Sequence, residues 1–313
     1  PAIQDFSFNG LWARNNSKPN GYFKLDITKL KLGEGNLKGM AELNSFVNPE
    51  LSFKANGQLN LIDLTPFLSQ DLLAEIRGKI QFNLNGMVKI TSPTNANQKR
   101  TYTLKDMAGD MELTGGNAFL KSDSLLFEAL QAKLTFRNGH LKVHNAYAKS
   151  KGSDVLFKGE WLYFLPWLND SMSDIILNGS LFSQKLDLNN FVKSNDEGEN
   201  ESSDILKLNL DVLVNNLTWD KHQVKDFKGL LMVSRSGFSL TNADMKTMEG
   251  SVHADLTLNQ NPDGRKTLQL KMKTDHVSIS QMFDRFNNFG QSTITDKHLS
   301  GFVNSEIMYE HSY

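Results

Sequence analysis

Residues 51–68 read LSFKANGQLNLIDLTPFL and contain two patterns, one after the other. From Leu51 to Leu61 every second residue is apolar or small, and the residues between them are Ser, Lys, Asn, Gln and Asn. This period of two places apolar side chains on one face of a β-strand and polar side chains on the other. The apolar spacing then becomes helical, with Asp63 and Thr65 as N-cap candidates. The stretch predicts a one-sided strand that continues into a short helix.

One-sided strands recur along the chain, and the same alternation is clear over 80–90, 206–214, 252–258 and 268–272. The helix after the first such strand is expected to extend to Ile76. A change of parity between Ile27 and Leu30 predicts a β-bulge, and Asn138-Gly139 is a strong hairpin signal. Buried parallel strands would be continuously apolar. The pattern therefore predicts an all-β fold with a few short helices, in which a long, twisted, mainly antiparallel sheet has one apolar face.

Three segments resemble one another and indicate an internal repeat: LNLIDLTPFL at 59–68, LDLNNFV at 186–192 and VSISQMF at 277–283. Each is strand-like, and each acquires helical spacing at its end. We expect one elongated β domain over 1–313, a fragment of a longer chain, with strand–strand–short-helix modules at about 20–90, 102–193 and 205–290. The stretch 194–204 (SNDEGENESSD) has five acids and no base, which predicts a flexible acidic loop.

Composition excludes several classes of function. The chain has 313 residues, 34 Lys and Arg against 35 Asp and Glu, and no Cys. A net charge of −1 gives no basic field for nucleic acid, so no nucleic-acid partner is expected. Without Cys there is no disulfide, thiolate metal site or cysteine nucleophile. No apolar run reaches the roughly 18 to 20 residues of a membrane-spanning helix.

No motif for catalysis is present. The chain lacks the Gly-x-Ser-x-Gly elbow, the Walker loop and the His-Glu-x-x-His pair. On a strand His140 and His144 share a face but lie about 13 Å apart, too far to bind one ion. Strand acids such as Asp110 and Asp211 could converge in a glycosidase, although nothing marks a pair. The prediction is a non-enzymatic protein with no catalytic residue, metal or cofactor.

Two aromatic segments leave alternatives open. Residues 161–168 (WLYFLPWL) form either a membrane-touching, lipid-gating or sugar-stacking segment or ordinary core at a corner of the sheet. The helical spacing of Met282, Phe283, Phe286 and Phe289 predicts either a helix that caps a groove or a packed amphipathic helix.

The chain resembles the AsmA-like proteins of Gram-negative envelopes, relatives of the repeating-β-groove lipid transporters, in the form typical of Bacteroidota. The resemblance rests on the texture and spacing of Leu37-Lys38-Gly39, Asn48-Pro49 followed by 51–61, Asp63 to Leu68, Leu186 to Val192 and Leu299-Ser300-Gly301. It implies a curved, taco-like sheet with a hydrophobic inner face. It also implies a periplasmic location with an inner-membrane anchor upstream of this segment, and a role in moving phospholipid for outer-membrane biogenesis.

The residues expected to line the apolar face, against lipid or core, are Leu51, Phe53, Leu59, Leu61, Ile80, Phe82, Leu84, Val88, Leu206, Leu208, Leu210 and Val212. The first hypothesis is a groove for phospholipid or another acyl-chain lipid. The second is a structural or interaction module of the envelope, a β-sandwich with a closed core. A weaker third is a carbohydrate-binding or glycoside-acting β protein.

Overall fold

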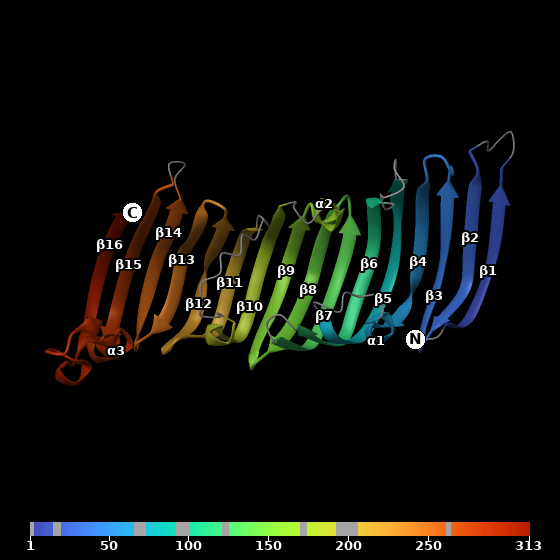
Figure 1. Cartoon of the computed structure of the whole chain (residues 1–313). Coiled ribbons are helices and arrows are strands. Elements are labelled where there is room, and N and C mark those ends of the chain that lie inside the picture. Colours follow the sequence, from blue (N-terminus) through green and yellow to red (C-terminus); the bar gives the residue numbers. More distant parts are fainter. Residues whose placement is uncertain are drawn as a thin grey trace. The chain divides into compact units, whose positions relative to one another are not determined.

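The structure is a computed structural model that describes residues 3–14, 20–65, 73–91, 101–120, 125–169, 174–191, 206–260 and 264–313 (Figure 1). The predicted acidic loop at 194–204 lies outside these residues. The chain divides into two compact units, the first formed by 1–150 and 159–175 and the second by 151–158 and 176–313. Within each unit, strand order follows chain order.

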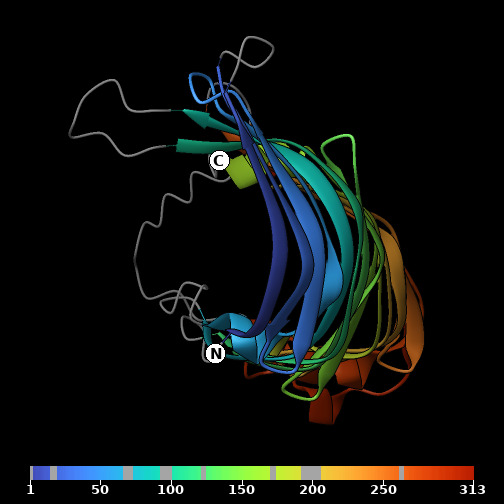
Figure 2. The ribbon, with the colours of Figure 1, turned by 90° about the vertical axis from the view of Figure 1, so that its right-hand side faces the viewer.

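The first unit consists of long antiparallel strands and two short helices. Its elements are β1 (Ile3–Ala13), β2 (Tyr22–Leu32), β3 (Gly35–Asn44), β4 (Glu50–Asn60), α1 (Leu61–Leu64), β5 (Leu73–Thr91), β6 (Thr101–Leu120), β7 (Leu125–Arg137), β8 (His140–Ser150), the end of β9 (Ser153–Leu162) and α2 (Phe164–Asn169). From β1 to β8 each strand pairs antiparallel with the next. Strands β1 to β4 are visibly bowed along their length, and α1 lies at one end of them (Figure 2).

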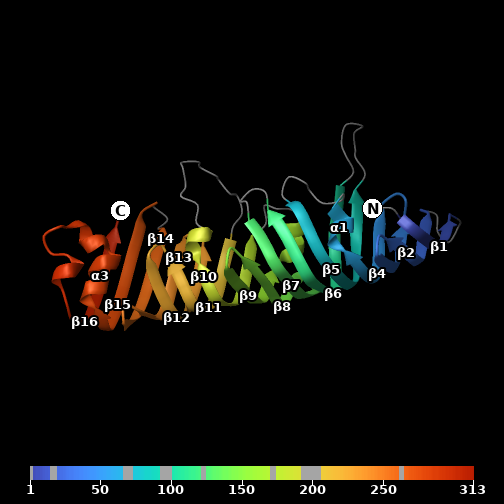
Figure 3. The ribbon, with the colours of Figure 1, turned by 90° about the horizontal axis from the view of Figure 1, so that it is seen from below.

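The second unit continues the same pattern. Its elements are the start of β9, β10 (Ile175–Asp187), η2 (Leu188–Asn190), β11 (Leu206–Trp219), β12 (His222–Ser234), β13 (Gly237–Thr247), β14 (Gly250–Gln260), β15 (Lys266–Ser278), α3 (Ile279–Arg285), η3 (Asn287–Gly290), η4 (Asp296–His298) and β16 (Phe302–Ser312). From β11 to β16 neighbours pair antiparallel. In the view from below, α3 lies at the ends of β15 and β16 (Figure 3).

One strand pair of the second unit runs parallel. Asn209 Nδ2 donates to Asn178 Oδ1 at 2.7 Å, and Asn215 Nδ2 donates to Gln184 Oε1 at 2.8 Å. Both contacts join residues 31 positions apart, so β10 and β11 advance in the same direction. The pairs from β1 to β8 and from β11 to β16 are antiparallel, which confirms the predicted all-β, mainly antiparallel fold.

Two local predictions are confirmed and one is wrong. The register of β2 against β3 shifts between Ile27 and Leu30, and Asn138-Gly139 forms the tight turn between β7 and β8. The expected helix to Ile76 does not form, because α1 ends at Leu64 and β5 already begins at Leu73. Alternation from Ile76 onward matches the pairing of β5 with β6, so strand pairing determines the conformation there.

The helix start also differs from the prediction. The N-cap of α1 is Asn60, in an extended conformation, and its side chain makes no capping hydrogen bond. Asp63 and Thr65, the predicted caps, lie inside α1 and at its C-cap. The strand simply turns into the helix, with Leu59 and Leu61 both buried at the junction.

Bulges in both units are stabilised by the same kind of hydrogen bond. At three register shifts, a residue with positive φ donates its backbone N–H to an Asn or Asp side chain on the adjacent strand. Asn242 donates to Asp255 Oδ1 at 2.8 Å, and His276 donates to Asn304 Oδ1 at 2.6 Å. Ala129 donates to Asn117 Oδ1 at 3.2 Å. The side chain replaces the ladder hydrogen bond that the extra residue disrupts, so the strand bends without leaving a donor unpaired.

Candidate functional site

The apolar face of the first unit is built from rows of residues that lie opposite one another on successive strands. Directly paired residues of antiparallel strands project to the same face. Three such rows are Leu25, Ala41, Phe53, Gly86 and Met107; Ile27, Gly39, Ala55, Leu84, Gly109, Phe136 and Leu141; and Leu37, Gly57, Phe82, Met111, Leu134 and Val143. No charged residue interrupts these rows.

The second unit has an apolar face of the same construction. Its rows are Leu208, Val233, Phe238, Leu258 and Leu268; Leu210, Leu231, Leu240, Leu256 and Leu270; and Ala243, Ala254, Met272 and Ile307. At one end of this face Val214, Phe227 and Ala243 form a small buried cluster with Leu186 and Met245 packed against it. The rest of the face is a single layer of side chains.

The predicted lining residues on strands lie on the apolar face of their own unit. In the first unit Leu59 is buried, whereas Leu51, Phe53, Ile80, Phe82, Leu84 and Val88 are half-buried. In the second unit Leu210 is buried, and Leu208 and Val212 are half-buried. Leu206 begins β11, and its side chain is outside the described part. Leu61 is not on a strand: it is the first residue of α1, and its side chain is buried.

This burial identifies an apolar face that no second sheet covers. Within each unit, the extensive contacts among described strands join neighbours in the sheet. Along β5 every second residue from Ile76 to Ile90 is apolar or Gly and is half-buried, and the residues between them, polar except for Met87, are exposed. Bowed strands explain this difference, because side chains on a concave face converge and shield one another while those on a convex face spread apart. The apolar side chains thus line the concave side of the strands.

Helix α2 covers one end of this face in the first unit. The Phe164 ring lies 5.7 Å from the ring of Phe136, and Trp161 and Trp167 pack beside it with ring centroids 4.6 Å apart. The Asn169 side chain fixes the helix to β6 through two 2.7 Å hydrogen bonds, to the backbone N–H and the C=O of Leu104. Within 161–168 only Leu165 is buried, and both Trp side chains are half-buried, whereas Tyr163 and Leu168 are 53% and 49% exposed. The segment is thus packed against the end of the sheet on one side and exposes apolar side chains on the other.

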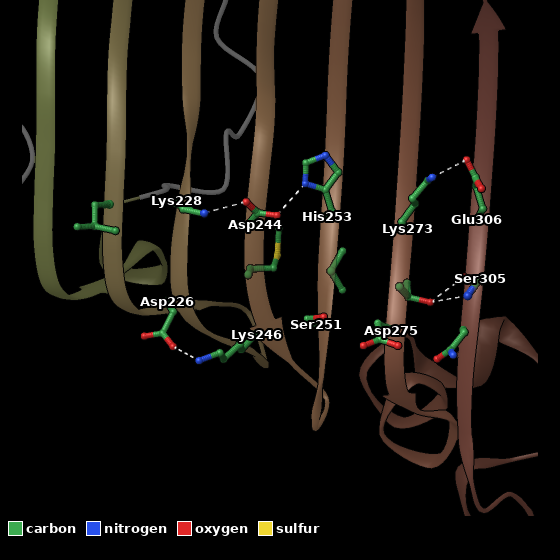
Figure 4. Close-up of a pocket in the computed structure, with 15 residues that line it drawn as sticks. Asp226, Lys228, Asp244, Lys246, Ser251, His253, Lys273, Asp275, Ser305 and Glu306 are labelled. Atoms are coloured by element: carbon green, nitrogen blue, oxygen red, sulfur yellow. Dashed lines mark hydrogen bonds and ion pairs between the residues drawn. The ribbon is translucent and has the colours of Figure 1, made fainter.

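The opposite face is polar and carries a ladder of charges across β12 to β16 (Figure 4). Lys228 lies 3.1 Å from Asp244, whose other oxygen is 2.7 Å from His253 Nδ1. Farther along, Lys273 lies 3.3 Å from Glu306. The hydrogen bond from His253, and then that from Lys228, lowers the pKa of Asp244. Exposed pairs of this kind contribute little to stability because water screens them.

This ladder borders a shallow hollow of about 780 Å³, and its chemistry does not form a reaction site. Each Lys side chain that lines it is paired with an acid, as in the contact between Lys246 and Asp226 at 2.7 Å. Within the described ranges, no group of three or more His, Cys, Asp or Glu could hold a metal ion. The hollow is a furrow between rows of long side chains on the polar face.

Sequence reasoning placed Phe283, Phe286 and Phe289 on one helix and did not connect them with Trp219 and His222. The helix α3 ends at Arg285, so Phe286 and Phe289 lie beyond it. Trp219 ends β11, and the ring of His222 lies between it and Phe286, which follows α3. More than 60 residues separate Trp219 from Phe286, and no periodicity connects them. Their proximity depends on the order of β11 to β15 in the sheet.

Comparison with known proteins finds no match: no family model, no curated protein and no solved structure matches this chain. In the part of the chain that the structure describes, no helix is long and apolar enough to span a membrane.

Proposed function

We propose that the apolar face of each unit binds the acyl chains of lipids, without catalysis. The observation that carries this proposal is a single-layered sheet whose apolar side chains are half-buried and are covered by no second sheet among the described residues. A continuous apolar face of this extent is unfavourable in water unless an apolar partner covers it. Acyl chains fit because they are flexible and contain no groups that require hydrogen bonds.

The energetics favour weakly selective binding. Each methylene removed from water contributes about 0.8 kcal/mol, and a chain on an open face gains part of that amount. The rows in both units contain Leu, Ile, Val, Phe, Met, Ala and Gly, with no charge to anchor a head group. Because every row is similarly apolar, a bound chain can shift along the face at little cost, which suits transfer of lipid better than storage at one site.

The resemblance to AsmA-like envelope proteins agrees with this reading and gives it a setting. In that setting the protein is periplasmic, attached to the inner membrane through a segment upstream of this one, and takes part in supplying phospholipid for outer-membrane biogenesis. These points belong to the proposal and are tested by fractionating cells that express the chain with its native flanking sequence.

The direct test is binding of a fluorescent fatty acid and of phospholipid to the delipidated protein, with native mass spectrometry of the protein as purified. Leu84→Asp places a charge on the apolar face of β5, and Asn83→Asp places the same charge on the polar face one position away. We expect Leu84→Asp to weaken binding at least about tenfold and Asn83→Asp to leave it unchanged.

Circular dichroism and thermal unfolding of both variants separate lost binding from lost folding. A folded Leu84→Asp variant that binds lipid as tightly as the unchanged protein would contradict the proposal. So would a purified protein that carries no lipid and binds none after delipidation, the outcome expected of a closed-core interaction module.

A further inference from the structure

An aromatic surface forms one end of the second unit. Three of its side chains are largely exposed: Trp219 at 60%, Phe286 at 48% and Phe289 at 56%. Phe302, at the start of β16, which pairs with the end of β15, is also exposed. We call Trp219, His222, Phe283, Phe286 and Phe289 the aromatic tip. Isolated exposed apolar residues are ordinary, whereas a contiguous group marks an interaction surface.

The rings of the aromatic tip form an unbroken series. Trp219 and His222 have ring centroids 6.2 Å apart, and His222 and Phe286 are 5.2 Å apart. Phe286 stacks on Phe289 at 5.6 Å with an interplanar angle of 15°, and Phe289 meets Phe283 edge-on at 5.0 Å. The turn after β11 and the segment after α3 therefore present one surface, although they are distant in sequence.

Polar contacts fix this surface in an exposed position. Lys221 Nζ donates to the backbone oxygen of Asp284 and, at 2.6 Å, to Asn287 Oδ1. Arg285 donates in return to the backbone oxygen of Lys221. Asn287, Asn288 and Phe289 all have positive φ, a conformation that is unfavourable for Phe. With the backbone turned in this way, the Phe289 ring stacks on Phe286. A surface held in place in this way loses little entropy on binding.

Charge indicates which partner fits. The two segments that carry the rings, 219–222 and 283–289, contain two cations, Lys221 and Arg285, and two acids, Asp220 and Asp284. Each cation donates to a backbone oxygen of the other segment. The surface thus presents rings without a net charge. This complements a layer that is itself neutral but polar, into which aromatic rings insert at the boundary between head groups and acyl chains.

We infer that the aromatic tip docks on the surface of a zwitterionic phospholipid bilayer. This inference rests on the proposed lipid-binding function, because contact with a membrane would bring the apolar face to its supply of lipid. Insertion of Phe286 and Phe289 provides the apolar contact, and the Trp219 indole N–H can reach head-group oxygens.

The test is co-flotation of the full chain with phosphatidylcholine vesicles. The variant Phe286→Ser/Phe289→Ser removes the stacked pair. Its control is Leu230→Ser/Met232→Ser, since these two apolar side chains are 41% and 49% exposed on the polar face of β12, outside the apolar rows. We expect the tip variant to partition at least about tenfold less into vesicles and the control to partition normally. Single substitution of Phe289 provides a milder variant if the double one folds poorly.

The outcomes distinguish this inference from the proposed function. A tip variant that no longer floats but still binds monomeric fatty acid supports docking at the aromatic tip. Flotation that is equal for both variants overturns it, as does failure of the unchanged protein to float. Flotation confined to anionic vesicles and abolished by salt also overturns it, because that pattern is typical of an electrostatic contact. If fatty-acid binding is absent while the tip still mediates flotation, the proposed function fails and docking stands alone.

Discussion

At the scale of single residues, the apolar face depends on alternation of large and small side chains across neighbouring strands. The ring of Phe53 on β4 lies over Gly86 on β5, its direct partner in the register. A Cβ at Gly86 would lie 2.8 Å from that ring and 2.6 Å from the backbone oxygen of Asp106. Glycine is needed here for close approach of a ring and a backbone, as is often seen in strands.

Gly86→Ala should therefore lower the free energy of unfolding by about 1 to 3 kcal/mol through overpacking. Gly10→Ala is the matched control. Gly10 lies on β1 opposite Leu25, in the same row as Gly86, and a Cβ at Gly10 would be 3.9 Å from its nearest neighbouring atom. The control should be neutral or slightly stabilising. Urea unfolding of both variants measures the difference, and equal stability would contradict this account of Phe53.

Asp244 gives a prediction about pH. Its pKa is lowered in the folded protein by the hydrogen bonds from His253 and Lys228. The resulting stabilisation is present above the pKa of the unfolded chain, about 4, and disappears as the pH falls through the folded pKa. Asp244→Asn should thus be slightly less stable than the unchanged protein at pH 7, and the difference should be smaller at pH 3. Thermal unfolding at both pH values checks this, and 1 M salt should shrink the effect.

At the scale of elements, short helices are fastened to strand ends by side-chain amides. Asn169 pairs with both backbone groups of Leu104, and Asn189 does the same for Asp220, accepting from its N–H at 2.6 Å and donating to its C=O at 3.2 Å. One side-chain amide thus makes both backbone hydrogen bonds that a residue on a neighbouring strand would otherwise make. Helices as short as α2, with six residues, and η2, with three, are unstable alone, so these contacts decide where they lie.

Asn169→Ala should release α2 from β6 and lower the free energy of unfolding by about 1 to 3 kcal/mol, because two hydrogen bonds are lost. Trp161 and Trp167 would become more accessible, which acrylamide quenching of fluorescence measures. Asn169→Asp keeps the acceptor for Leu104 N–H and should have an intermediate effect. Unchanged quenching in the Ala variant would show that ring packing alone holds the helix.

At the scale of the whole molecule, an uncovered apolar face has a measurable consequence. The native protein should bind a hydrophobic dye such as bis-ANS at neutral pH, behaviour otherwise associated with partly folded states. Added fatty acid should displace the dye and raise the stability by about 2.7 kcal/mol at a hundredfold excess over its Kd. Native protein that binds no dye at all would indicate that the face is occupied or covered.

Much of this fold follows from local pattern. The period of two assigned each strand residue to a face. The change of parity after Ile27 located a bulge. Both follow because the register of a strand depends on which of its side chains are kept away from water. The end of α1 was misplaced because Leu72 and Leu73 fit a helical pattern as well as a strand pattern. Pairing with β6, which involves residues far along the chain, decided between them.

The sequence alone determined that the strands have one apolar and one polar face, because alternation is a property of neighbours in the chain. Tertiary structure decided whether that face is covered, since cover depends on which elements return over it. It also decided the parallel pairing of β10 with β11 and the meeting of Trp219 with Phe286. These features arise from strand order in the sheet, and no pattern within a single stretch of sequence encodes them.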